Sequence, residues 1–210
     1  MTDRTIAVVS GGLRVPSSTR LLADQLGEAA VAAFAEAGDS VQLRQVELRD
    51  HAHGIMDALL TGFPTGGLRD AVETVTTADA LVVVTPTFQA SYGGLFKSFF
   101  DLVEAGSLRG VPVLLGATGG TERHSLVIEH ALRPLFSYLG AVSVPTGVYA
   151  ATADFGGDGA PALATRIRRA ARELAALTAG STRPGREPGV VPFADMLAAT
   201  RPPDPRGGRR

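Results

Sequence analysis

The sequence predicts an α/β protein in which five parallel strands form one sheet with helices on both faces. Short apolar runs alternate with segments of helical periodicity along most of the chain, and the runs are continuously apolar. Continuously apolar strands are typical of a sheet buried on both faces, and intervening helices are typical of parallel pairing. With 210 residues, the chain is long enough for one well-buried domain.

The strands are predicted from short apolar runs. They are expected at residues 6–9, 41–43, 81–85, 111–115 and 142–149. The run at 81–85 gives the strongest signal, and Pro86 closes it. Each of the runs at 6–9 and 81–85 leads directly into a loop of unusual composition.

Helices are predicted where apolar residues recur at intervals of three and four. The first is expected to begin at Ser17 and to stop at Gly38. Further helices are expected over residues 68–75, 92–104, 123–139 and 163–177. Residues 49–66 are polar, so a loop with room for a short helix is expected there. Pro134 is expected to kink or split its helix, because proline removes a backbone donor and clashes with the preceding turn.

The chain divides into residues 1–180, expected to form the domain, and a tail at 181–210 rich in Pro, Gly and Arg. Such a tail has little to bury and is expected to be flexible.

Composition narrows the classes of function. The net charge is −1, so no binding to nucleic acid or to an anionic membrane is expected. The chain has no cysteine, which excludes disulfides, thiolate metal sites and cysteine nucleophiles. Redox chemistry would therefore need a bound cofactor. The N-terminus has neither a secretory nor a membrane-spanning pattern, so a cytoplasmic protein is expected.

A hydroxyl-rich loop, residues 10–20, follows the first predicted strand. Its hydroxyl side chains are those of Ser10, Ser17, Ser18 and Thr19. The start of the following helix offers unpaired N–H groups and a positive dipole end, which favour a bound phosphate. Arg14 or Arg20 would add positive charge. The alternative is an ordinary helix cap and turn, because Ser and Thr are also preferred caps.

Two further loops follow predicted strands, where ligands bind in open α/β sheets. The second loop contains Pro86, Thr87, Phe88, Gln89 and Ser91, and the third contains Thr118, Gly119 and Gly120. An aromatic ring, an amide and small residues suit a flat heteroaromatic ligand, and adjacent glycines allow close approach of the backbone. Ordinary turns, with Phe88 packed beneath the second, are the alternative.

Other catalytic chemistry finds little support. No G-x-S-x-G segment is present, and the acidic residues and histidines at 50–57 lack a recognised metal-ligand spacing. Lys97 is expected to pair with Asp101 one turn away. His124 and His130 are interpreted as capping or packing residues. We therefore predict no metal site and no catalytic side chain.

Taken together, the three loops resemble those of the NAD(P)H-dependent FMN reductases. The matching segments are residues 9–11, 17–20, 85–97, 117–121 and 129–136. The resemblance covers roughly residues 5–178 and is nearest to the branch that supplies reduced flavin to two-component monooxygenases. It implies a flavodoxin-like, doubly wound sheet in the strand order 2-1-3-4-5.

The resemblance also implies where the ligands bind. The FMN phosphate is expected on the first loop, the isoalloxazine between residues 86–89 and 118–121, and a phosphate of NADPH or NADH near Arg14. The predicted cofactor-binding residues are Ser10, Arg14, Ser17, Ser18, Thr19, Pro86, Thr87, Phe88, Gln89, Ser91, Thr118, Gly119 and Gly120. The resemblance further implies a homodimer or homotetramer, because flavin sites in these reductases commonly lie near a dimer interface. Some relatives carry Tyr in place of His130, in a widened helical turn at the subunit interface, so His130 is expected to tune flavin release or oligomer packing.

The expected function is hydride transfer from NAD(P)H to FMN, with reduced FMN passed to a partner monooxygenase. That transfer is intrinsic to the two cofactors, so the protein needs only to stack the rings and tune their surroundings. The alternatives are a quinone or azo-compound reductase, a flavodoxin-like electron carrier, and a binding module without flavin. The net charge of −1 argues against the carrier, because such carriers are usually strongly acidic.

Overall fold

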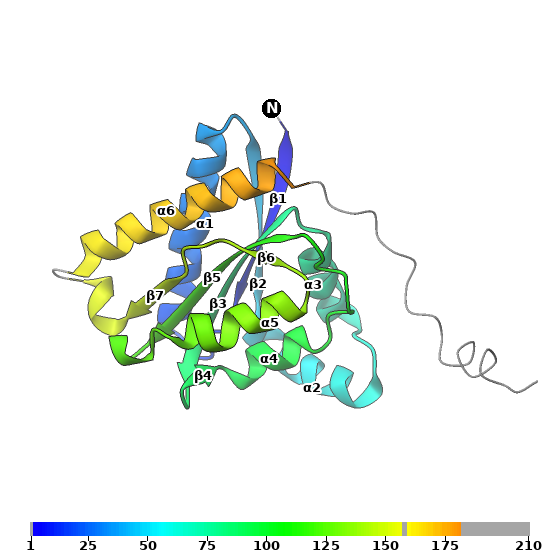
Figure 1. Ribbon diagram of the computed structural model, residues 1–210. Helices are drawn as coiled ribbons and strands as arrows, with labels where there is room; N and C mark the ends of the chain where they lie inside the picture. The colour runs from blue at the N-terminus through cyan, green and yellow to red at the C-terminus, as the bar shows by residue number, and fades with distance from the viewer. Residues whose placement is uncertain (1, 157–158, 182–210) are drawn as a thin grey trace, which may run out of the picture.

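One twisted sheet lies between two layers of helices (Figure 1). The structure is a computed structural model that describes residues 2–156 and 159–181. Its strands are β1 (Asp3–Ser10), β2 (Ser40–Glu47), β3 (Ala80–Phe88), β4 (Ser91–Tyr92), β5 (Pro112–Gly119), β6 (Val142–Ser143) and β7 (Val148–Ala151). The order across the sheet is β2-β1-β3-β5-β6, and these neighbours pair in parallel. The predicted flavodoxin-like α/β fold is confirmed.

Two details of the sheet differ from the prediction. The strand expected at 142–149 is two short strands, β6 and β7, and both pair in parallel with β5. Pro145 lies between them and has no N–H to continue the ladder. The other detail is β4, a two-residue strand that pairs antiparallel with the end of β3.

The helices are α1 (Ser18–Glu36), α2 (Ala52–Thr61), α3 (Gly66–Thr77), α4 (Gly94–Phe100), α5 (Arg133–Tyr138) and α6 (Ala160–Ala179). Short 3-10 turns are η1 (Leu48–His51), η2 (Glu122–His124) and η4 (Thr152–Phe155), and η3 (Ile128–Leu132) is a π-helix. The predicted stop after the first helix is confirmed, because Gly38 has a left-handed φ of +89°.

Two helix predictions were partly right. Residues 49–66, expected to be a loop with room for a short helix, contain η1 and the ten-residue helix α2. The buried side chains Leu48, Ile55 and Ala58 hold this segment to the core. The helical segment expected over 123–139 is split, as predicted for Pro134: η2, η3 and α5 follow one another. Pro134 lies in the first turn of α5, where its missing N–H costs nothing.

Two apolar cores form, one on each face of the sheet. Helices α1 and α6 cover one face, and α3, α4 and α5 cover the other with α2 at its edge (Figure 1). The core beneath α3, α4 and α5 holds four fully buried aromatic rings, Phe96, Phe99, Phe100 and Phe136, and the other three all contact Phe100.

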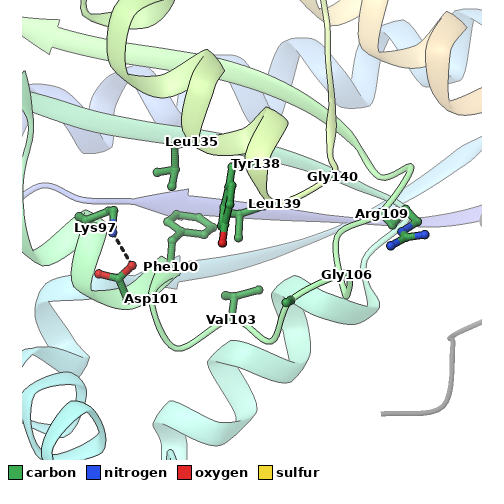
Figure 2. Close-up of a pocket in the computed structure, with 11 residues that line it drawn as sticks. Lys97, Phe100, Asp101, Val103, Gly106, Arg109, Leu135, Tyr138, Leu139 and Gly140 are labelled. Carbon is green, nitrogen blue, oxygen red and sulfur yellow. Dashed lines mark hydrogen bonds and ion pairs between the residues drawn. The ribbon is translucent and has the colours of Figure 1, made fainter. Parts of the chain in front are cut away.

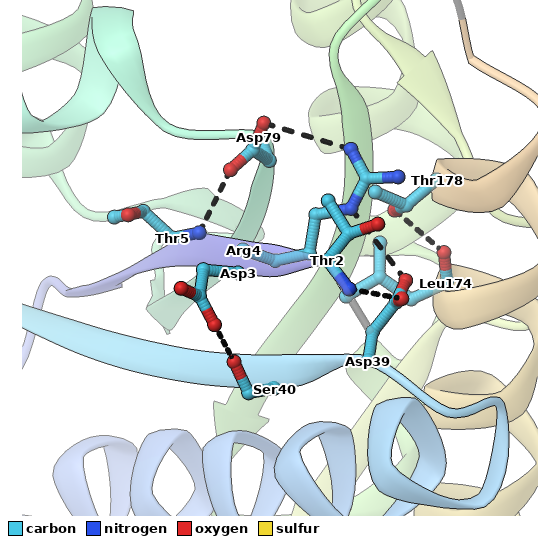
Figure 3. A network of polar contacts seen from close by, with 9 residues as sticks. All are labelled: Thr2, Asp3, Arg4, Thr5, Asp39, Ser40, Asp79, Leu174 and Thr178. Atoms are coloured by element: carbon cyan, nitrogen blue, oxygen red, sulfur yellow. Dashed lines mark hydrogen bonds and ion pairs between the residues drawn. The ribbon is translucent and has the colours of Figure 1, made fainter.

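The amino ends of the central strands are closed by polar contacts (Figure 3). Asp79 accepts a hydrogen bond from the N–H of Thr5 at 2.8 Å, and Asp39 accepts one from Thr2 at 3.2 Å. The Arg4 guanidinium lies within 3.6 Å of Asp39 and 3.8 Å of Asp79. This end of the sheet is tied together by charge pairs, which leaves the carboxyl ends as the open edge.

The predicted tail lies outside the described residues, except for Ser181, whose hydroxyl donates to the carbonyl of Gly110 at 3.1 Å. Within the described chain, no helix is both long and apolar enough to cross a membrane.

Candidate functional site

The three loops singled out from the sequence meet at one edge of the sheet. Strands β1, β3 and β5 are parallel neighbours, so the loops that follow them open at the same edge. The first and third loops are joined directly, because the hydroxyls of Thr19 and Thr118 lie 2.8 Å apart and are buried. The first loop is tied to β3 by a 2.8 Å bond from the N–H of Gly11 to the carbonyl of Val84. Pro86 and Thr118 are register partners, which places the second loop beside the third.

The hydroxyls of the first loop have different surroundings. Ser17 is the N-cap of α1, and its Oγ accepts from the N–H of Arg20 at 3.2 Å. Ser10 is fully buried, and its Oγ lies near the Glu47 carboxylate but makes no hydrogen bond of regular geometry among the described residues. Ser18 is exposed, whereas Thr19 is 3% exposed and engaged with Thr118. The cap expected as the alternative is therefore present, and it positions the start of α1 beside the buried hydroxyl.

Gly12 allows the two ends of the first loop to approach closely. A Cβ atom at this position would lie 2.1 Å from the Ser17 Oγ and 3.3 Å from the Thr19 Cβ. A side chain here would displace the Ser17 hydroxyl and press on the two Cβ atoms, so glycine lets the loop form a tight backbone cradle with its cap intact.

The two arginines of the first loop are not equivalent. Arg20 binds Asp24 at 2.8 Å and Glu47 at 3.0 Å, so it is already neutralised. Burial raises the pKa of the Glu47 carboxyl, and the charge of Arg20 opposes that rise only in part. Arg14 is exposed and makes no ion pair with any residue in the described ranges, so it is the cation left for a ligand.

The second loop is a tight β-hairpin rather than a plain turn. Phe88 pairs with Ser91, and the two residues between them, Gln89 and Ala90, have φ of +48° and +66°. Left-handed φ at both positions is typical of a type I′ two-residue turn, and non-glycine residues adopt it at a cost. Strain of this kind clusters at binding sites. Phe88 is 47% exposed, so the alternative with its ring packed beneath the loop is wrong.

Thr85, at the base of this hairpin, was missed by the sequence reasoning. Its buried hydroxyl accepts from the N–H of Gly93 at 3.0 Å and donates to the carbonyl of Pro86 at 3.0 Å. It thereby fixes the start of the hairpin against the start of α4. Thr87, which follows, has a buried Oγ1 that lies near the Tyr149 hydroxyl but makes no hydrogen bond of regular geometry in the described residues.

Tyr149 on β7 was also missed. Its hydroxyl donates a hydrogen bond to the carbonyl of Thr121 at 2.6 Å. A Cβ atom added to Gly119 would lie only 2.1 Å from this hydroxyl, so the glycine makes room for it. Burial raises the pKa of the Tyr149 phenol, so it stays a donor at neutral pH. Tyr149 therefore holds the third loop to the neighbouring strand, and no motif in the sequence marks it.

We expect Tyr149→Phe to weaken FMN binding by about 2- to 10-fold, because losing one hydrogen bond costs about 0.5–1.5 kcal/mol. The dissociation constant is measured by quenching of FMN fluorescence. Tyr138→Phe is the matched control, because Tyr138 is 88% exposed and lies on α5. An unchanged dissociation constant for Tyr149→Phe would show that this contact does not support the loop.

The widened helical turn implied by the resemblance is present as the π-helix η3, with His130 inside it. His124 and His130 are both exposed, so neither packs in the core. Arg133 binds Glu129 through two hydrogen bonds of 2.7 and 2.9 Å and donates to the carbonyl of Val144 at 3.0 Å. These contacts join the π-helix to the segment between β6 and β7.

A cavity of about 580 Å³ lies between α4 and α5, away from the three loops (Figure 2). Its lining includes Arg109 and Gly140, which precede β5 and β6, so it lies toward the amino ends of these strands. Lys97 pairs with Asp101 at its wall, as predicted (Figure 2). None of the predicted cofactor-binding residues lines it.

Comparisons with known proteins agree with this geometry. The family described as NADPH-dependent FMN reductase matches residues 4–156. An FMN reductase (NADPH) of Pseudomonas aeruginosa is 41% identical over 83% of this chain and 92% of its own length. The NADH-dependent FMN reductase SfnF of Pseudomonas putida is 41% identical over 71% of this chain and 78% of its own.

A solved oxidoreductase from Corynebacterium diphtheriae superposes with a TM-score of 0.83 and 46% identity, over 87% of this chain and all of that one. The agreement of sequence, fold and loop geometry has one consequence: the chain belongs to the NADPH-dependent FMN reductase family, and it is a flavin- and NAD(P)H-using oxidoreductase.

Proposed function

We propose that the protein reduces FMN with NAD(P)H and releases the reduced FMN to a flavin-dependent monooxygenase. The observation that supports this most is the meeting of three loops at one sheet edge, joined by the bond between Thr19 and Thr118. Its relatives include reductases named for NADPH and for NADH. The resemblance of the loops to the monooxygenase-serving branch supports the partner, and a cytoplasmic homo-oligomer stays a prediction from the sequence.

The residues present fit an FMN phosphate at the first loop. The loop offers a buried hydroxyl on Ser10 that makes no hydrogen bond of regular geometry among the described residues. It also offers the start of α1, where backbone N–H groups favour an anion. Gly12 leaves no side chain in the cradle. Ser10, Ser17, Ser18 and the N–H groups around them would hold the phosphate. Thr19 faces Thr118 and would act mainly by joining the loops.

The second and third loops would hold the isoalloxazine. The strained hairpin at Gln89 and Ala90 presents backbone groups and the exposed face of Phe88 at the site. Thr87 contributes a buried hydroxyl that makes no hydrogen bond of regular geometry in the described chain. Gly120 allows close approach of the third loop to the ring. Gly119 makes room for the Tyr149 hydroxyl, which holds that loop through the carbonyl of Thr121.

The role of the protein in the reaction is positioning. When bound, FMN accepts a hydride from the nicotinamide, which is chemistry intrinsic to the two cofactors. The loops orient the flavin, the hairpin fixes one side of its ring, and Arg14 attracts a phosphate of the nicotinamide nucleotide. No protein acid or base is required for the transfer, in keeping with the prediction of no catalytic side chain.

Anaerobic oxidation of NADPH and NADH, with and without free FMN, tests this proposal. We expect oxidation to require FMN, and FMN in excess of the enzyme to be reduced completely, because the reduced flavin leaves after each turnover. A quinone serves as the competing acceptor. Turnover that requires quinone and ignores added FMN would contradict the proposal and favour a quinone reductase. Reduction limited to one FMN per chain would contradict release to a monooxygenase.

A further inference from the structure

A second cavity, of about 850 Å³, lies between the segment that contains η3 and the first turns of α6. Its apolar lining includes Leu126, Pro145 and Pro161, and its polar lining includes Thr165, Arg166 and Arg169. Leu126 is 60% exposed, which makes an apolar surface available inside an open cavity. The cavity therefore combines an apolar surface with two guanidinium groups.

The charge of this cavity is positive. Arg166 and Arg169 are three residues apart on α6 and so lie on neighbouring positions of one helix face. Arg166 makes no ion pair with any residue in the described part of the chain. Arg169 is balanced by Glu173 at 3.1 Å through its Nε alone, so the uncompensated charge of the cavity comes from Arg166. The carboxylate on the facing wall, Glu129, is neutralised by Arg133 through two hydrogen bonds.

The wall beneath the arginines is fixed by Glu173. Its carboxylate accepts hydrogen bonds from the N–H and the hydroxyl of Thr146, both at 2.7 Å. Burial acts to raise the pKa of Glu173, but the bonds from Thr146 and Arg169 outweigh burial, and the pKa lies below its ordinary value. The carboxylate is therefore ionised at neutral pH and holds the β6–β7 link against α6.

The cavity adjoins the ring-facing loops. Tyr149 lines it, and the same side chain donates to Thr121 and borders Gly119 in the third loop. Tyr149 therefore borders both the third loop and this cavity.

We propose that this cavity holds the adenosine end of NADPH and that Arg166 and Arg169 bind its 2′-phosphate; this inference rests on the proposed function. A phosphate monoester carries about −1.5 to −2 charges at neutral pH, which matches two adjacent arginines. Guanidinium groups bind phosphate oxygens in pairs of parallel hydrogen bonds. Leu126 and the two prolines offer an apolar surface for the adenine. The structure thereby predicts a preference for NADPH over NADH.

Arg166→Gln tests the role of the phosphate in turnover. We expect the KM for NADPH to rise about tenfold or more, because a hydrogen-bonded charge pair is lost, while the KM for NADH and kcat change less than about twofold. Arg172→Gln is the matched control. Arg172 is on the same helix, 65% exposed, and pairs with Glu36 outside the cavity. An equal rise in KM for both nucleotides, or no rise for either, would overturn the 2′-phosphate assignment.

Calorimetric titration of the full-length protein with adenosine 2′,5′-bisphosphate tests the site without turnover. We expect binding that Arg166→Gln weakens about tenfold and Arg172→Gln leaves unchanged. If the bisphosphate binds as expected but the protein does not reduce FMN, the proposed function fails and the anion site stands. If FMN is reduced but the bisphosphate binds equally to wild type and Arg166→Gln, the site assignment fails and the function stands.

Discussion

Replacing Gly12 with alanine is expected to lower the affinity for FMN by about 10- to 100-fold. The new Cβ would lie 2.1 Å from the Ser17 Oγ and 3.2 Å from its Cβ, so the hydroxyl that caps α1 must move. Moving it disturbs the cradle that holds the phosphate, and hydrogen bonds to a charged group contribute about 1.5–3 kcal/mol each. Fluorescence titration with FMN measures the loss.

Gly54→Ala is the matched control for this substitution. Gly54 lies in α2, and the nearest atom to an added Cβ belongs to Leu68 at 3.7 Å, an ordinary contact. We expect its FMN affinity to equal that of the wild type, with a small gain in stability, because alanine favours helix. Equal FMN affinity in Gly12→Ala and Gly54→Ala would mean that the first loop does not bind the phosphate.

Replacing Phe100 with alanine is expected to have the largest effect on stability. Phe100 is 1% exposed, and its ring centroid lies 4.8 Å from that of Phe96, 5.3 Å from Phe99 and 4.9 Å from Phe136. Removing a fully buried ring costs about 3–5 kcal/mol, because it loses transfer free energy and leaves a cavity. Urea unfolding should show a lower midpoint at an unchanged m-value.

Phe63→Ala is the matched control, because it removes the same side chain from an exposed position. Phe63 is 61% exposed, so we expect its free energy of unfolding to stay within about 0.5 kcal/mol of the wild type. If both variants lose the same stability, the four-ring cluster is not the centre of this core.

The fold could be predicted from the sequence where burial leaves a continuous pattern. The run at 81–85 and the helix that stops at Gly38 are confirmed because their apolar spacing and turn chemistry point the same way. The extent of helix α2 was underestimated because only Ile55 and Ala58 are buried in it, while apolar neighbours such as Leu60 are exposed. The π-helix was not predicted from periodicity, since it changes the hydrogen-bond spacing without a composition signal.

For the candidate site, the sequence predicted the three loops but not all of the residues that hold them in place. The three loops were found because hydroxyls and glycines mark the ends of apolar strands. Tyr149 and Thr85 were missed because each contacts a residue distant in the sequence or acts through backbone groups. The sequence did not reveal that Arg20 is held by Asp24 and Glu47, since the contact with Glu47 depends on the pairing of β1 with β2.

Comparison of FMN with riboflavin tests the central claim most directly, because the two ligands differ only in the phosphate. The first loop is assigned to that phosphate and the other two loops to the shared ring. We expect the wild-type protein to bind FMN on the order of 100-fold more tightly than riboflavin, since several charge-assisted hydrogen bonds are lost. We also expect Gly12→Ala to narrow this ratio by weakening FMN binding alone. Equal affinity of the wild type for FMN and riboflavin would contradict the account.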